Sequence, residues 1–289
     1  MQVIFNGLIT GAAIAILALA FQIVYLPTRV FFIGMAGVYA VSPFIALTIV
    51  GVGGAQWVAG VVSATAAVII CMACEWLIHA PLDRRRASGG VHLIASLGFS
   101  IIAVQIISIV WGNNTQVLRT DATLVSHLGG VSVTAAQWLT IGLATAVIGA
   151  FALFLKQSDM GLRLRALADN PMQFALHGHN VSYYRLLSFG LAGFLTSVAS
   201  LVTAYDMGFT AYSGLNALLL AIVAVIIGGQ NSFVGSVMGG LFVGVIRSLV
   251  AWYWSARWQE PLTFALLALV LLLLPQGLLG RKTRLEASQ

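Results

Sequence analysis

Long apolar runs recur from one end of the chain to the other, separated by short polar passages. Most are about 20 residues long, the length that an α-helix needs to cross a bilayer. The polarity does not alternate as it does in the strands of a membrane β-barrel. The pattern therefore predicts an all-α, polytopic membrane protein with about eight to nine transmembrane segments, expected at residues 3–26, 30–50, 57–80, 91–111, 137–155, 186–205, 215–227, 233–254 and 261–274.

Two of these segments carry residues that interrupt helices. The segment 30–50 contains Ser42-Pro43, so we expect it to be kinked or broken. The segment 215–227 is short, and Gly228-Gly229 follows it directly. Irregular backbone inside a membrane is tolerated only where it packs on protein or lines a cavity. Gly228-Gly229 is therefore a candidate for an unwound segment beside a substrate path.

Composition supports a membrane location throughout the chain. Hydrophobic residues make up 60% of the sequence and charged residues 8%, against roughly a quarter charged in soluble domains. The first apolar run has no basic region before it and is followed by further spans, so we interpret it as a span rather than a cleaved signal peptide. We expect one transmembrane domain, residues 1–289, surrounded by lipid.

Three basic clusters predict the orientation in the membrane. The positive-inside rule places three groups in the cytoplasm: Arg84–Arg86 in the loop that begins with Leu82-Asp83, Lys156 with Arg163, Arg165 and Arg185, and Arg281–Arg284. Three segments precede the first cluster, which puts the N-terminus outside, and four follow Arg185, which puts the C-terminus inside. The loop at about 112–136 is then external and the loop at about 156–185 cytoplasmic. This count requires 215–227 to cross the membrane. The net charge of +6 thus reflects orientation, and nucleic acid is not an expected partner.

The cytoplasmic loop contains a complete set of helix boundary signals. Asn170 is a good N-cap, and Pro171 suits the first helical position. Gln173 stands where a capping box has its partner residue, and Gly178 favours the left-handed conformation that ends a helix. These residues predict a helix of about two turns, from Pro171 to His177.

The side chains of this short helix suggest two interpretations. Met172, Phe174 and Leu176 are apolar, with little room to be buried in so short an element, and Arg163 and Arg165 form a basic strip before it. One interpretation is a helix bound by a cytoplasmic partner. The other is an interfacial helix at the lipid headgroups. The residues alone favour neither.

Cys71 and Cys74 have the C-x-x-C spacing of metal or redox sites. They lie inside a hydrophobic span, however, and no second Cys or His pair matches them. We interpret them as small packing residues and expect no metal site.

Glycines of the segment 233–254 have two small-x-x-x-small spacings, Gly235 with Gly239 and Gly240 with Gly244. Bare glycines on one face of a helix allow another helix to approach closely. We expect these residues to serve helix packing.

Ionisable residues within the spans are few, which limits the possible mechanisms. Glu75 lies near a cytoplasmic end, where a basic loop residue can pair with it; Asp206 lies near an outer end; and Arg247 lies deeper. No chain of ionisable residues crosses the membrane, which argues against a proton pump or a voltage sensor. We find no catalytic motif and no complete phosphate loop, so the chain itself is expected to be non-catalytic and not to bind ATP.

Several stretches, in order over nearly the whole chain, resemble the integral-membrane permeases of branched-chain amino acid ABC importers, the LivH-type subunits. They are specific only in combination. The stretches are Asn6-Gly7-Leu8 with Gly11; Glu75 with Ala80-Pro81-Leu82; Leu93 to Ser100 with Gln105; Gly161, Arg165-Ala166, Asn170, Ala175 and Gly178; Gly228-Gly229, Ser232, Gly235, Gly239-Gly240 and Gly244; and Pro275 to Gly280.

This resemblance implies a permease fold with two related halves in a bacterial inner membrane. It implies a second, related permease (a heterodimer), two cytoplasmic ABC ATPases that use ATP and Mg, and an external or periplasmic solute-binding protein. The chain itself would bind no cofactor. Its cytoplasmic helix would be a coupling helix that docks into an ATPase cleft, with Phe174 and Met172 as apolar knobs and Arg163 and Arg165 as polar contacts. ATP-driven movement of this helix would switch the cavity between outward-open and inward-open states.

The resemblance also suggests a translocation path for a small solute. Its candidate lining residues are Phe31, Phe32, Ser42, Ser96, Ser100, Gln105, Gly228, Gly229 and Arg247. Family members often carry an Asn-Phe-Ala/Ser-His-Gly run where this chain has Phe31 to Met35, and often an acidic residue where it has Arg247. The expected solute is therefore a branched-chain amino acid or a related apolar or aromatic amino or carboxylic acid, and these differences favour the latter. The alternative function is a secondary transporter or channel that needs no ATPase.

Overall fold

The apolar runs form helices in the computed structural model, which describes residues 2–118, 125–128, 131–274 and 277–279. Seven helices in this part of the chain are long and apolar enough to cross a membrane. They are α1 (Gln2–Thr28); the continuous helix Gln56–Arg84, which contains α3 (Gln56–Cys74) and α4 (Ala80–Arg84); α5 (Gly89–Trp111); α6 (Ala135–Gln157); α9 (Val181–Met207); α11 (Phe233–Tyr253); and Ala256–Leu273, which contains α12 (Gln259–Leu273).

Two further apolar helices are shorter than the seven. α2 (Met35–Gly51) has 17 residues and α10 (Ser213–Gly228) has 16. All nine expected segments are therefore helical. The segment 30–50 was expected to be a full span, but its first residues are not helical and α2 begins only at Met35. Pro43 lies inside α2 and leaves the carbonyl four residues before it without its helical donor. The Ser200 hydroxyl of α9 donates to this carbonyl, that of Tyr39, at 2.5 Å, so the helix continues.

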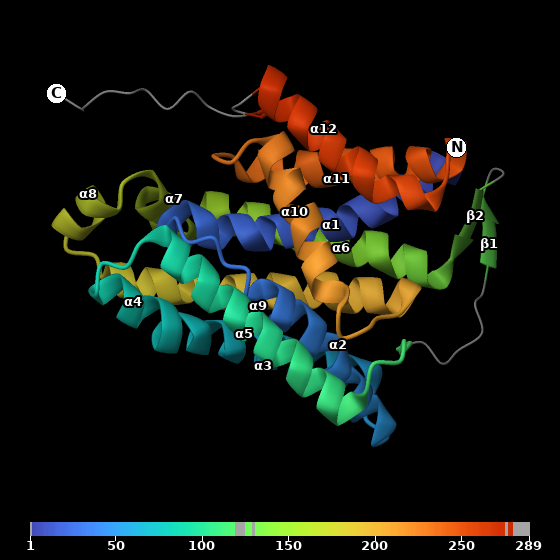
Figure 1. Ribbon diagram of the computed structural model, residues 1–289, viewed down its shortest axis with the longest axis horizontal. Helices are drawn as coiled ribbons and strands as arrows, with labels where there is room; N and C mark the ends of the chain where they lie inside the picture. Colours follow the sequence, from blue (N-terminus) through green and yellow to red (C-terminus); the bar gives the residue numbers. More distant parts are fainter. Residues whose placement is uncertain (1, 119–124, 129–130, 275–276, 280–289) are drawn as a thin grey trace.

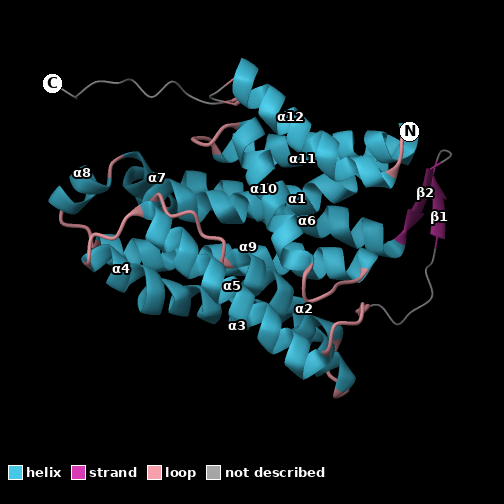
Figure 2. Ribbon diagram, in the orientation of Figure 1, coloured by secondary structure: helices cyan, strands magenta, loops and turns pink. Residues whose placement is uncertain are grey.

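The remaining elements lie in the two long loops. A two-stranded antiparallel hairpin, β1 (Val125–Leu128) and β2 (Val131–Thr134), occupies the loop before α6. α7 (Asp159–Asp169) and α8 (Pro171–Leu176) occupy the loop between α6 and α9. The hairpin and α7 were not expected from the sequence. Figure 2 shows that helices account for nearly all of the described chain.

The long helices run roughly along the longest axis of the molecule (Figure 1). The N-terminus and the hairpin lie at one end, and α4, α7 and α8 lie at the other. α10 crosses the long helices steeply instead of running alongside them.

α1 and α9 form the interior of the bundle. About two thirds of each span is buried within the molecule, 61% for α1 and 67% for α9, against 22% for α5 and for α6. α1 packs against α9, α10 and α11. The outer helices therefore present most of their apolar side chains outward, as expected of surfaces that face lipid or another subunit.

Glycines bring α1, α10 and α11 into backbone contact. Gly235 and Gly239 face α10: a methyl group on Gly239 would lie 2.0 Å from the Ala224 carbonyl oxygen. Gly240 and Gly244 face α1, and a methyl group on Gly244 would lie 2.2 Å from Gly11 Cα. The two spacings thus serve two different neighbours.

The chain after α12 returns to end α10. The N–H groups of Leu278 and Leu279 donate to the carbonyls of Ile227 and Gly228 at 2.8 and 3.0 Å, which satisfies carbonyls that a helix end leaves free. Gly229 has a φ of 114°, which favours glycine. Two parts of the stretch Pro275 to Gly280 that resembles the permease family, Pro275-Gln276 and Gly280, lie outside the described residues, as does the basic tail.

Candidate functional site

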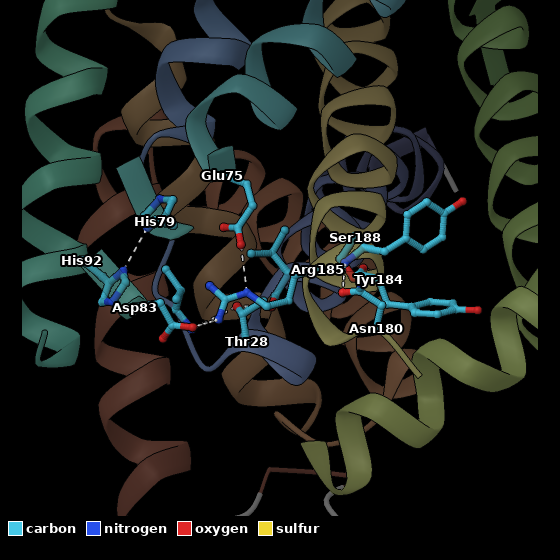
Figure 3. Close-up of polar contacts among 12 residues, drawn as sticks. Thr28, Glu75, His79, Asp83, His92, Asn180, Tyr184, Arg185 and Ser188 are labelled. Atoms are coloured by element: carbon cyan, nitrogen blue, oxygen red, sulfur yellow. Dashed lines mark hydrogen bonds and ion pairs between the residues drawn. The ribbon is translucent and has the colours of Figure 1, made fainter. Parts of the chain in front are cut away.

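A polar cluster lies at the end of the molecule opposite the N-terminus. It consists of Glu75, His79, Asp83, His92 and Arg185 (Figure 3). The first three lie four residues apart on the continuous helix, which places them near one face. The segment Glu75–His79 is π-helical, a local widening that is frequent at functional sites.

Arg185 joins two carboxylates of this cluster. Its Nε donates to Glu75 Oε1 at 2.8 Å and its Nη1 to Asp83 Oδ2 at 2.6 Å. Glu75 is buried, with 3% of its surface exposed, whereas the Asp83 side chain is 58% exposed. A buried carboxylate needs a compensating charge, and Arg185 supplies it. The expectation that a basic residue pairs with Glu75 is thus confirmed, but the partner comes from a span and not from a loop.

His79 and His92 form a second contact within the cluster. Their Nδ1 atoms are 3.1 Å apart, and their rings are stacked with centroids 5.4 Å apart. A hydrogen bond between two imidazoles requires one ring to donate and the other to accept. Phe32 and Phe189 pack against His79, so the pair has an apolar wall.

The elbow, defined here as residues 158–180, contains α7 and α8. Asn170 Oδ1 accepts the N–H groups of Met172 and Gln173, both at 3.1 Å, and Gly178 has a φ of 79°. The predicted cap and left-handed stop are therefore confirmed, with α8 ending at Leu176. The cap of α8 consists of the bonds that the Asn170 side chain accepts, and it does not include the bond from the Gln173 side chain to the Asn170 backbone that would complete a capping box.

The expectation that the apolar side chains of α8 have little room to be buried is wrong for Phe174. This ring is 5% exposed and packs edge-on against Tyr184, with centroids 5.2 Å apart. Met172 and Leu176 are 77% and 79% exposed. A short helix can bury one residue because α9 begins directly beside it. Phe174 therefore anchors α8 and is not available as a knob for a partner.

The basic strip before α8 is also different from the expected one, because it is the helix α7. Ser158 caps this helix by accepting the N–H of Met160. Residues two apart on a helix are related by a rotation of about 200° and therefore point to nearly opposite sides, so Arg163 and Arg165 do not share a face. Arg163 Nη1 donates to the Tyr184 hydroxyl at 2.9 Å, a bond that raises the pKa of the arginine.

Some candidate path residues gather around the segment that joins α1 to α2. Phe31 packs edge-on against Phe21, and Phe32 is fully buried. Ser96 of α5 accepts the N–H of Ile33 at 3.2 Å and donates to Leu93 O at 2.9 Å. Ser100 lies one turn further along α5, where its backbone contacts Gly37.

The other candidate path residues are not brought to this place. The Ser42 hydroxyl donates to Val38 O within α2, and Gln105 is on the exposed face of α5. Gly228 and Gly229 pack against the backbone of Gly235 and Gly277. A role in lining the path stays a prediction for each of them.

Arg247 lies towards the far end of α11. Its Nη2 donates to Gln259 Oε1 at 3.4 Å, and Gln259 Nε2 donates back to Arg247 O at 3.2 Å. Its Nη1 is buried with no hydrogen-bond partner among the described residues. This part of the guanidinium is a free donor for an anionic group.

Cys71 and Cys74 are free and buried, and Cys71 lies where Gly193 of α9 comes close to α3. Among the described residues, no group of three His, Cys, Asp or Glu side chains is arranged to hold a metal ion.

Sequence reasoning missed the polar cluster as a unit. Arg185 was grouped with the cations of the loop before the span expected at 186–205, and Asp83 was assigned to a basic loop, although it lies in α4. The available signal was the four-residue spacing of Glu75, His79 and Asp83, which marks one polar face at the end of an apolar span. Nothing local indicates that His92 and Arg185 complete it.

Comparison with known proteins identifies the family. A family model described as "Branched-chain amino acid transport system / permease component" matches residues 3–273. The chain belongs to this family. The match agrees with the resemblance of the motifs and with an all-α, polytopic permease. The family is one of transport permeases and not of catalytic enzymes.

Relatives match this chain over nearly their whole length. The high-affinity branched-chain amino acid transport system permease protein LivH of Salmonella typhimurium is 28% identical over 304 residues, 97% of this chain and 96% of that protein. LivH of Escherichia coli is 28% identical over 298 residues, with the same coverage of each chain. The permease protein BraD of Pseudomonas aeruginosa is 27% identical, also covering 97% of this chain and 96% of its own.

A solved structure shares the fold. The chain matches the structure "PsaBC from Streptococcus pneumoniae in complex with Fab" with a TM-score of 0.52 and 18% identity, over 93% of this chain and 91% of the other. At this identity the likeness shows the fold alone.

Proposed function

We propose that this protein is the membrane-spanning subunit of an ATP-driven importer in a bacterial inner membrane, and that it moves a small solute by alternating access. The match to the permease family over residues 3–273 carries the proposal. ATP and Mg are used by two ABC ATPase subunits in the cytoplasm. A second, related permease completes the path, and an external or periplasmic solute-binding protein delivers the solute.

The positions of the basic residues support the proposed orientation. Arg84 ends α4 and Arg85 and Arg86 follow it, and Arg163 and Arg165 lie on α7, so both groups are at the end opposite the N-terminus (Figure 1). Positive residues favour the cytoplasmic side, which puts the N-terminus outside. α12 runs back from the N-terminal end toward the elbow end, consistent with a cytoplasmic C-terminus.

The elbow is the proposed docking site for an ATPase subunit. Met172 and Leu176 present two exposed apolar side chains on a helix capped by Asn170. Four residues separate them, so they lie on one side of α8. A helix that lays an apolar side into a groove is a common mode of recognition. Phe174, buried against Tyr184, holds the helix in place.

The proposed solute is a branched-chain amino acid or a related apolar or aromatic amino or carboxylic acid. Phe31 and Phe32 provide apolar surface near Ser96. Arg247 Nη1, buried without a partner among the described residues, provides a donor for a carboxylate. A charge-assisted bond to such a group is stronger than a neutral one.

Co-purification tests the docking proposal. We expect ATPase subunits to accompany the wild-type chain and to be lost when Met172→Ser and Leu176→Ser are combined. Met207→Ser, an exposed methionine at the opposite end of α9, is the matched control and should retain them. If no ATPase accompanies the wild type, the importer is excluded and ion-dependent uptake in liposomes tests the secondary transporter.

Uptake assays test the role of Arg247. Arg247→Gln should lower uptake of a branched-chain or aromatic carboxylate about tenfold, the effect expected from loss of one charge-assisted bond. Arg257→Gln changes an exposed arginine nearby and serves as control. Equal uptake by Arg247→Gln and wild type would remove Arg247 from the proposed path.

A further inference from the structure

Two neighbouring residues at the start of α9 face different parts of the molecule. Successive residues of an α-helix point about 100° apart. Tyr184 faces the elbow and Arg185 faces the continuous helix Gln56–Arg84 (Figure 3). Both are buried, at 5% and 9% exposure. A single residue step therefore separates the residue that contacts α8 from the residue that bonds the π-helical segment and α4.

Tyr184 holds both helices of the elbow. Its ring packs against Phe174 of α8, and its hydroxyl accepts the bond from Arg163 of α7. His179, between α8 and α9, packs against both Phe174 and Tyr184. A displacement of α8 thus reaches the first turn of α9 through packed rings.

Arg185 spans the π-helical segment from one side to the other. Glu75 is its first residue, and Asp83 lies in α4 beyond its end. The two bonds from one guanidinium hold the two sides of this segment at a set separation. A rigid, planar fork is suited to two carboxylates at once, whereas a lysine ammonium is a single point of charge.

The bonding capacity of this pair is not fully used. Arg185 Nη2 and Glu75 Oε2 are buried without hydrogen-bond partners among the described residues. One donor and one acceptor are therefore available for a second arrangement of the same groups. Deeper in the bundle α9 and α3 are in close contact, since a methyl group on Gly193 would lie 2.5 Å from Ala67 O.

We propose that Tyr184 and Arg185 are the positioning residues that transmit movement of α8 to the helix Gln56–Arg84, with the π-helical segment Glu75–His79 as the place where that helix yields. This proposal rests on the proposed function, because it assigns the path by which a docked ATPase acts on the spans. The acting contacts are Phe174 with Tyr184 on one side and Arg185 with Glu75 and Asp83 on the other.

The assembled complex in liposomes provides the first test. Arg185→Lys should leave ATP hydrolysis in place while transport per ATP hydrolysed falls about tenfold, as expected from loss of a charge-assisted bond. Asp83→Asn should lower the same ratio about threefold, because its side chain is largely exposed. Arg84→Lys, an exposed arginine of α4, is the control and should leave the ratio unchanged.

Asp83→Asn also protects the test against misfolding. If Arg185→Lys does not assemble, this exposed variant still reports on the link. The proposal would be overturned if the two single variants, Asp83→Asn and Arg185→Lys, both transported as much solute per ATP as the wild type. If Arg185→Lys fails to assemble, the same result for Asp83→Asn alone would overturn it.

Hydrogen exchange on the purified permease tests the link without any ATPase. Phe174→Ala loosens α8, and exchange of residues 75–84 should rise about fivefold; Gln173→Ala, exposed on the same helix, should not change it. The rise should disappear when Arg185→Lys is already present. An equal rise in exchange with and without Arg185→Lys would contradict the link between α8 and the helix Gln56–Arg84. The docking test with Met172→Ser and Leu176→Ser is separate, because its result bears only on the proposed function.

Discussion

Two regions of the molecule are held together in opposite ways. Where α1, α10 and α11 meet, glycines bring backbones into direct contact, as at Gly244 and Gly11. At the polar cluster, the side chain of Arg185 joins α9 to the continuous helix Gln56–Arg84 through ion pairs with Glu75 and Asp83. We call the first region the glycine seam.

The contrast indicates which region moves. Close-packed backbones have one arrangement, and any change of spacing creates a void or a clash. Charged side chains can exchange partners over a few ångströms, and Arg185 Nη2 and Glu75 Oε2 have no hydrogen-bond partner in the part of the chain that the structure describes. We infer that the glycine seam is a rigid block and that the polar cluster is a joint.

The largest expected effect is at the buried half of the cluster. Glu75→Ala leaves Arg185 without its buried partner, and removing one member of such a pair costs about 3–5 kcal/mol. The melting temperature of the purified permease in detergent should fall accordingly. Adding Arg185→Leu should restore part of the loss, because the unpaired charge is then gone. An unchanged melting temperature in Glu75→Ala would mean that the pair is not buried as described.

The glycine seam should be almost as sensitive to one added carbon. Gly244→Ala places a methyl group against the backbone of α1, and overpacking of this kind costs about 1–3 kcal/mol. Gly142→Ala is the matched control on α6, because its methyl group would meet nothing within 4 Å. Equal melting temperatures for the two variants would show that α1 and α11 separate readily.

A smaller effect is expected at the cap of α8. Asn170→Ala removes the acceptor for the N–H groups of Met172 and Gln173, which costs about 1 kcal/mol. Hydrogen exchange of the first turn of α8 should become about fivefold faster. Asn180→Ala removes a cap from α9, which tertiary packing holds, and α8 should then exchange as in the wild type. Unchanged exchange in Asn170→Ala would show that Phe174 alone holds the helix.

The smallest effect on stability is expected at the exposed half of the cluster. Asp83→Asn removes an ion pair whose carboxylate is 58% exposed, and exposed pairs contribute less than about 1 kcal/mol. The melting temperature should therefore change little, while transport per ATP falls. If Asp83→Asn lost as much stability as Glu75→Ala, the cluster would serve only to stabilise the fold and not to transmit movement.

Local signals predicted local structure well. The cap at Asn170, the stop at Gly178 and the positions of the long spans follow from residue type and hydrophobic pattern, which act within a few residues; the start of α9, five residues before the expected one, does not. Phe174 shows the limit of such reasoning, since its burial depends on Tyr184, ten residues further on and part of another helix. α7 was missed because Arg163 and Arg165 were interpreted only as a basic strip, although Ser158 provides the cap of a helix.

The sequence by itself determined the helical spans, their family motifs and the short capped helix, because apolar length and capping are encoded next to each other along the chain. Only the tertiary structure decided that Arg185 lies between Glu75 and Asp83, that His79 meets His92, and that Gly240 and Gly244 face α1 while Gly235 and Gly239 face α10. These contacts join residues up to hundreds of positions apart. They are decided by how the helices pack against one another, which no local pattern specifies.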